Sequence, residues 1–161
     1  MDTKEAVDIL RKYLSSQGLK FTSQRQTVTE VFFDPLFRDE HPTVEELYLK
    51  VKARDSRVGY ATVYRTLKLL VDCELANPTR FGSDQMRYEP EAPGEHHDHL
   101  VCNACGAILE FEDEDIEALQ VAVAKRLGFE LEDHKMVLFG RPIGGCTYRT
   151  CKIDESTQSD S

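Results

Sequence analysis

The chain of 161 residues contains no apolar run long enough to cross a membrane and no internal repeat. Its first five residues show no basic segment leading into an apolar one, so no secretory signal is visible. The chain also lacks an H-E-x-x-H motif and a recognisable nucleophile, which argues against a metal-dependent hydrolase. We therefore expect a cytoplasmic protein of one domain or two small ones that is not an enzyme.

The chain has five cysteines, and four of them form two closely spaced pairs. The pairs are Cys102 with Cys105 and Cys146 with Cys151. Two such pairs can close a tetrahedral zinc site with four cysteine ligands, and Gly106 can supply the tight turn after the first pair. In a reducing cytosol zinc is favoured over the alternative, a redox disulfide. Cys73 has no close partner in the sequence, so we interpret it as a buried structural thiol, with a reactive thiol as the alternative.

Three of the five histidines stand in the run His96-His97-Asp98-His99, directly before the first cysteine pair. If this run is extended, successive side chains point to opposite faces of the strand. His97 and His99 then point one way, and His96 and Asp98 point the other way. The alternation predicts that one short strand supplies ligands to two separate metal sites.

The net charge of −9 is unevenly distributed along the chain. Residues 1–90 hold 14 basic and 14 acidic residues, whereas residues 91–161 hold 6 and 15. Between the halves, residues 90–95 (PEAPGE) read as a hinge. We predict one domain over residues 1–89, a linker over 90–95, a second domain over 96–151 and a disordered tail over 152–161. A balanced first half can still present one basic face to nucleic acid.

Hydrophobic periodicity and turn signals predict an α+β fold. Expected helices cover residues 3–17, a stretch starting near Thr22 or Ser23, a stretch announced by the capping box of Thr43 and Glu46, and residues 61–74. Expected strands cover residues 75–81 and 85–89 around a turn at residues 82–84. Short helices followed by a two-stranded ribbon describe an N-terminal winged helix-turn-helix domain.

The helix over residues 61–74 would be the recognition helix of such a domain. Its exposed side chains would be Thr62, Tyr64, Arg65 and Lys68, which can contact base edges or phosphates. Lys20 and Arg25, at the start of the second helix, can add phosphate or minor-groove contacts. The alternative is that these side chains are ordinary solvated groups.

Four motifs together resemble the ferric uptake regulator family. They are residues 59–67 (GYATVYRTL), 96–106 (HHDHLVCNACG), 19–25 (LKFTSQR) and 41–48 (HPTVEELY). The resemblance extends from about Leu10 to Cys151, nearly the whole chain. It implies a C-terminal α/β dimerisation domain, in which residues 113–127 form a helix and residues 135–139 a strand.

The resemblance further implies three metal sites in each chain. Structural zinc would be bound by Cys102, Cys105, Cys146 and Cys151; a regulatory metal by His41, Glu89, His97, His99 and Glu110; a third metal by His96, Asp98, Glu117 and His134. Simpler interpretations remain open for three of these residues. His41 before a proline also suits a surface loop, Glu110 suits a solvated acidic run, and a neighbouring glutamate, Glu91 or Glu95, can replace Glu89.

By the same resemblance, the chain is a metal-dependent transcriptional repressor of metal-uptake genes. It would bind a double-stranded DNA operator with an inverted repeat as a homodimer, with a tetramer also possible. The expected effector is Fe²⁺, for which Mn²⁺, Co²⁺ or Zn²⁺ can substitute. The zinc-sensing branch tends to use a cysteine in the regulatory site, and the peroxide-sensing branch tends to have aspartates where this chain has Glu89 and Glu110. A peroxide-, manganese- or zinc-responsive regulator is the alternative within the family, and a metal-dependent hydrolase is the alternative outside it.

Overall fold

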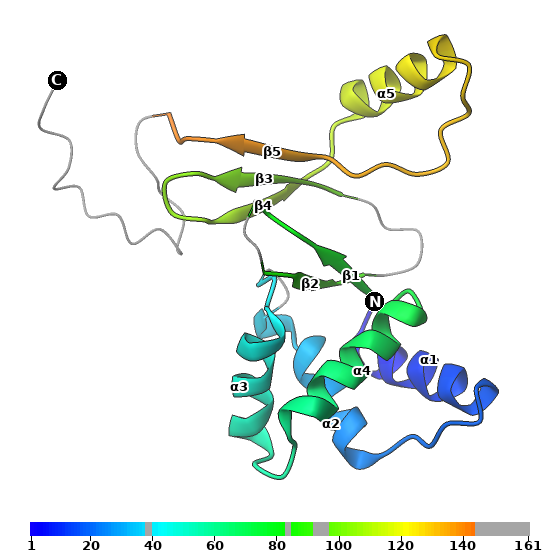
Figure 1. The fold of residues 1–161 in the computed structure, drawn as a ribbon, viewed down its shortest axis with the longest axis vertical. Helices are drawn as coiled ribbons and strands as arrows, with labels where there is room; N and C mark the ends of the chain where they lie inside the picture. Colours follow the sequence, from blue (N-terminus) through cyan, green and yellow to red (C-terminus); the bar gives the residue numbers. More distant parts are fainter. Residues whose placement is uncertain (38–39, 83–84, 92–96, 144–161) are drawn as a thin grey trace, which may run out of the picture. The chain divides into compact units, whose positions relative to one another are not determined.

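The computed structural model describes residues 1–37, 40–82, 85–91 and 97–143 (Figure 1). The chain divides into two compact units between Glu95 and His96, and each unit has its own β-sheet. Both helices and strands are present, so the α+β class is confirmed. Among the described residues, no helix combines the length and apolar composition that crossing a bilayer requires.

The first unit begins with a series of helices. They are α1 (Thr3–Ser16), α2 (Ser23–Phe32), the short 3₁₀ helix η1 (Pro35–Phe37), α3 (Val44–Arg54) and α4 (Tyr60–Asp72). Side chains cap the starts of α1, α2 and α3. Thr22 caps α2 by accepting the backbone N–H of Arg25. At α3, Thr43 and Glu46 each accept a backbone N–H of the other, which is the expected capping box. The predicted helix starts lie within a residue of the observed ones, because caps are local signals.

The helices of the first unit enclose its hydrophobic core. Its fully buried side chains include Leu10, Leu14, Val28, Leu47, Val51, Val63, Leu67, Leu70 and Leu75. Burial of each such side chain stabilises the folded state by about 1.5–3 kcal/mol relative to leaving it exposed. On α4 the buried positions 63, 67 and 70 follow the spacing of one helix face, and Tyr64, Arg65 and Lys68 remain exposed on another face. The helix is therefore fixed by its core side while its polar side stays accessible.

A two-stranded antiparallel sheet completes the first unit. It pairs β1 (Ala76–Thr79) with β2 (Arg87–Pro90), and Asn77 lies opposite Glu89 in the register. The strands are shorter than predicted at the turn, and β2 extends one residue further than expected. The sequence assigns Pro90 to the linker, but this residue ends β2, where a missing N–H is tolerated. The backbone N–H of Glu91 donates to the carbonyl of Leu75, so the chain is still hydrogen-bonded to the first unit one residue beyond β2.

The second unit contains a three-stranded sheet in the order β4-β3-β5. Strand β3 (Asp98–Cys102) pairs antiparallel with β4 (Ile108–Phe111) and parallel with β5 (Val137–Gly140). Helix α5 (Glu114–Arg126), capped by Asp113, connects β4 to β5, and none of its residues, all of them described, is buried. The sequence does not predict strand β4, because its short segment runs into an acidic stretch. Its pairing with β3 is a tertiary effect that local periodicity does not reveal.

Candidate metal centres and nucleic-acid interface

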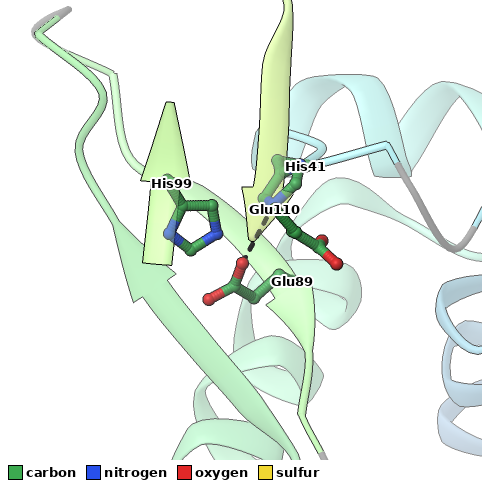
Figure 2. A group of neighbouring side chains, drawn as sticks. All are labelled: His41, Glu89, His99 and Glu110. Atoms are coloured by element: carbon green, nitrogen blue, oxygen red, sulfur yellow. Dashed lines mark ion pairs between the residues drawn. The ribbon is translucent and has the colours of Figure 1, made fainter. Parts of the chain in front are cut away.

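A buried ion pair joins the loop before α3 to strand β2 in the first unit. Nε2 of His41 lies 2.9 Å from Oε2 of Glu89, and the two side chains are each 3% exposed (Figure 2). The amide Nδ2 of Asn77 donates to the other carboxylate oxygen, Oε1, at 2.8 Å. The ring of Phe81 stands edge-on to that of His41 at 5.3 Å between centroids. His41 is thus buried against Glu89, and the surface-loop interpretation of this histidine is wrong.

Further hydrogen bonds hold the His41 loop against β2. The guanidinium of Arg87 donates to the carbonyl of His41 at 2.6 Å and to Oε2 of Glu46 at 3.0 Å. The backbone N–H of Tyr88 donates to the carbonyl of Pro42 at 2.9 Å. Burial acts to raise the pKa of Glu46, but the backbone N–H of Thr43 and the charge of Arg87 outweigh it and hold that pKa below its usual value. Two candidate ligands from distant parts of the sequence are therefore fixed beside each other.

A second group of candidate ligands lies on one face of the sheet in the second unit. His99 and Glu110 are directly opposite each other on β3 and β4, and Figure 2 also draws these two side chains. The ring of His97 lies 5.1 Å from that of His99, and Nε2 of His97 lies 3.9 Å from Oε1 of Glu110. Sequence reasoning placed the two histidines on a common face, and the structure agrees. Glu110 is the exposed member of this group.

A third group lies wholly within the second unit and uses the opposite side of β3. One ligand atom each from Asp98, Glu117 and His134 lies within 4.8 Å of the others. Nε2 of His134 is 3.2 Å from Glu117 Oε1 and 3.8 Å from Asp98 Oδ1. The backbone N–H of Met136 donates to Asp98 Oδ1 at 3.2 Å and so orients that carboxylate. His96, the fourth ligand implied by the resemblance, lies outside the described residues.

The first cysteine pair occupies a tight turn between β3 and β4. The backbone N–H of Cys102 donates to the carbonyl of Ala107, and that of Gly106 donates to the carbonyl of Cys102, both at 2.8 Å. Gly106 has φ +73, in the left-handed region that glycine adopts without strain. This turn brings Cys102 and Cys105 onto one short loop, as a C-x-x-C zinc half-site requires. Cys146 and Cys151 lie outside the described residues.

Cys73 is a half-buried thiol at the end of α4. Its Sγ donates to the carbonyl of Leu70 at 3.6 Å. Burial raises the pKa of this thiol to about 11, so it is protonated at neutral pH. A protonated thiol is a poor nucleophile, and the interpretation of Cys73 as a structural residue is favoured over that of a reactive one.

The candidate DNA-contacting residues do not share one environment. Tyr64 and Arg65 are exposed on α4, with Lys68 Nζ 5.9 Å from the ring centre of Tyr64, whereas Thr62 is half-buried. Lys20 is exposed before α2. The half-buried Arg25 donates to the backbone carbonyl of Lys20, which gives it a local structural role beside any contact with phosphate. Tyr60, a further exposed aromatic residue of α4, packs its ring 5.6 Å from that of Tyr48.

Sequence reasoning missed the residues that support the candidate ligands His41 and Glu89, namely Asn77, Phe81 and Arg87. Their partners are His41 and Glu89 or the backbone beside them. Of these three residues, only Asn77 could have been found from the sequence, through the pairing of the two predicted strands. Asn77 and Glu89 are polar residues of two strands joined by a turn, and the correct register would have paired them.

Comparisons with known proteins agree with this geometry. Residues 16–139 match the Ferric uptake regulator family. The ferric uptake regulation protein of Campylobacter jejuni is 41% identical over 145 residues, covering 89% of each chain. The Helicobacter pylori ferric uptake regulator, whose structure reveals three functional metal-binding sites, superposes with a TM-score of 0.79 at 29% identity and covers 97% of both chains. The structure of the Francisella tularensis ferric uptake regulator with iron superposes with a TM-score of 0.68 at 33% identity. The match covers 78% of this chain and 92% of the other. On the family match over residues 16–139 and the identity to these relatives, the chain belongs to the ferric uptake regulator family.

Proposed function

We propose that the protein is a transcriptional repressor that binds double-stranded DNA when ferrous iron is bound and so controls metal-uptake genes. The observation that carries this proposal is the division of ligands between the units. His41 and Glu89 form a buried pair in the first unit, and His97, His99 and Glu110 share one face of the sheet in the second. One ion bound by both groups would couple the two units across residues 90–95.

Ferrous iron is the proposed effector because the regulatory ligands are imidazoles and carboxylates without a thiolate. This ligand set suits Fe²⁺, and Mn²⁺, Co²⁺ or Zn²⁺ can also occupy it. The iron-containing relative from Francisella tularensis supports iron. The alternatives within the family are a manganese-, zinc- or peroxide-responsive regulator. Glutamates at positions 89 and 110 and the lack of a cysteine among these ligands favour an iron sensor.

DNA binding is assigned to the first unit as a winged helix-turn-helix domain. Helix α4 presents Tyr64 and Arg65 to solvent from a rigid core, and the β1–β2 hairpin would form the wing. Lys20 and Arg25 would contact phosphate or the minor groove, and Thr62 would add to the contacts of α4. Base-edge bonds from arginine are typically worth about 1–3 kcal/mol each.

The second unit is assigned to dimerisation and metal binding. Helix α5 leaves Leu119 64% and Val121 52% exposed, and Leu127 and Phe129 beyond it are also exposed. A homodimer would cover such side chains, and a tetramer of two such dimers remains compatible with them. Structural zinc would be held by Cys102, Cys105, Cys146 and Cys151. The third metal would be held by Asp98, Glu117, His134 and His96.

Metal binding would act through geometry rather than through charge. The net charge of −9 stays strongly negative in the metal-bound form, since the thiolates of the zinc site offset much of the charge of the ions. A repressor of this kind binds two half-sites with two recognition helices, so their separation and tilt decide affinity. A metal that binds only one arrangement of the units shifts the population toward it.

The deciding experiment measures DNA selection in the presence of different metals. Protein with zinc retained in the cysteine site is mixed with random double-stranded DNA and Fe²⁺ under anaerobic conditions, with Mn²⁺, Co²⁺ and Zn²⁺ in parallel. The proposal expects enrichment of one inverted repeat with Fe²⁺, enrichment of the same repeat with the ions that can substitute for it, and none with chelator. Enrichment that does not depend on metal contradicts the metal-responsive function, and absence of any enriched sequence contradicts DNA binding.

A further inference from the structure

The carboxylate of Glu89 has its two oxygens bonded to two different neighbours. Oε1 accepts the Nδ2–H of Asn77 at 2.8 Å, and Oε2 lies 2.9 Å from Nε2 of His41. Asn77 and Glu89 are direct partners across the β1–β2 hairpin, so their side chains project from the same face of the sheet. Because Glu89 is only 3% exposed, protein groups rather than bulk water set the orientation of its carboxylate.

The chemistry of the pair fixes which way the Asn77 amide faces. An ionised carboxylate only accepts hydrogen bonds, so the NH₂ group of Asn77 must be the end that faces Glu89. A hydrogen bond to a charged acceptor is stronger than one between neutral groups. Asn77 lies within β1, where its backbone is paired with β2, and its short side chain has little freedom to leave. Oε1 is therefore held on the Asn77 side, and Oε2 is left beside the imidazole nitrogen of His41.

We propose that Asn77 is a positioning residue for the regulatory metal. Its amide holds Oε1 of Glu89, which would leave Oε2, next to Nε2 of His41, as the oxygen available to the ion. This inference rests on the proposed function, in which both residues are ligands. Without the amide, Glu89 can rotate, bind through both oxygens or pair with His41 in a different geometry. Loss of an outer-shell partner of a metal ligand typically lowers metal affinity by about 10–100-fold.

A matched control exists on the same strand. Thr79 lies two residues from Asn77, so its side chain shares that face of β1. Its Oγ1 is buried and has no hydrogen-bond partner in the part of the chain that the structure describes. Replacing Thr79 with valine changes the same strand at similar size without removing a bond to a ligand. If Asn77 only stabilised the hairpin, Asn77→Ala would lower the thermal stability of the first unit but would leave the spectrum of bound Co²⁺ as it is in the wild type and in Thr79→Val.

The experiment titrates full-length protein, with zinc retained in the cysteine site, with Co²⁺ and Mn²⁺. Four variants are compared with the wild type: Asn77→Ala, Thr79→Val, Glu89→Ala and His41→Ala. The His41→Ala protein supplies the signal of any site that does not use this histidine. For Asn77→Ala we expect about 10–100-fold weaker binding of both ions and a changed visible spectrum of bound Co²⁺. For Thr79→Val we expect the wild-type affinity and spectrum.

Each outcome decides a separate question. Wild-type affinity and spectrum in Asn77→Ala, with loss of binding in Glu89→Ala, overturn the role of Asn77 and leave the proposed function in place. Wild-type binding in Glu89→Ala removes this glutamate from the ligand set, and the role of Asn77 falls with it. Equal losses in Asn77→Ala and Thr79→Val identify a hairpin effect and likewise overturn the proposal.

Discussion

At the scale of single residues, the spacing of the histidines predicted which of them share a face, but it did not predict which side chains surround them. The alternation in residues 96–99 placed His97 and His99 on one face, and the structure brings these two rings together. Burial of His41 with Glu89 followed from no local pattern, because the two residues are far apart in sequence and meet through Arg87 and the β1–β2 hairpin. The supporting bond from Asn77 likewise depends on register, which the turn residues alone did not define.

The exposed side chains of α4 lead to a prediction at the same scale. Arg65→Ala and Tyr64→Ala should each weaken operator binding by about 1–3 kcal/mol, roughly 5–150-fold, because base contacts are lost while the helix stays in place. Both residues are exposed, so metal content and thermal stability should not change. Binding is measured by fluorescence anisotropy at fixed salt and metal. Lys12→Ala, an exposed change on α1, is the control, and unchanged affinity in both α4 variants would move the DNA interface elsewhere.

At the scale of elements, helices were predictable and strands were less so. Caps such as that of Thr43 are local and mark the start of a helix in the sequence. Strand β4 exists because it pairs with β3. Its four residues (ILEF) are too few to show an alternation in isolation, and an acidic stretch follows them directly. The extent of the hairpin also depends on pairing, as the position of Pro90 at the end of β2 demonstrates.

The capping box of α3 gives a prediction about this helix and about His41, the candidate ligand in the loop before it. Thr43→Ala removes the acceptor for the N–H of Glu46, so the unfolding free energy should fall by about 0.5–2 kcal/mol. Glu46 also accepts from Arg87, which donates to the carbonyl of His41, so the regulatory metal should bind more weakly as well. Denaturant unfolding and metal titration measure the two effects. Ser15→Ala, an exposed change in α1, should produce neither, and a Thr43→Ala protein of wild-type stability would contradict the role of the cap.

At the scale of the whole molecule, the zinc site is expected to hold the second unit together. Its sheet has three short strands and its helix α5 has no buried residue, so hydrophobic packing within one chain is limited. Binding of a structural zinc is itself folding free energy. Cys102→Ser or Cys146→Ser should therefore each remove one zinc per subunit and lower the thermal stability of the second unit. Metal analysis and calorimetry test this, and variants that retain both zinc and stability would disprove the assignment of four cysteine ligands.

The two faces of β3 should differ in their effect on DNA binding, because only one of them is proposed to reach across the linker. His99 shares its face with His97 and Glu110, and the proposed regulatory site adds His41 and Glu89 from the first unit. His99→Ala should therefore abolish most metal-stimulated DNA binding while the zinc and the fold survive.

His134 belongs to the group with Asp98 and Glu117, whose described members all lie in the second unit. A metal held by these residues cannot tie the two units together directly. His134→Ala should accordingly weaken dimerisation or local stability, with a smaller loss of metal response. Operator affinity is measured against free Fe²⁺ or Mn²⁺ for the two variants side by side, with dimer content checked by ultracentrifugation. Full activation in His99→Ala with none in His134→Ala would assign regulation to the opposite face of β3, and a metal that couples the units through His41 would no longer explain the switch.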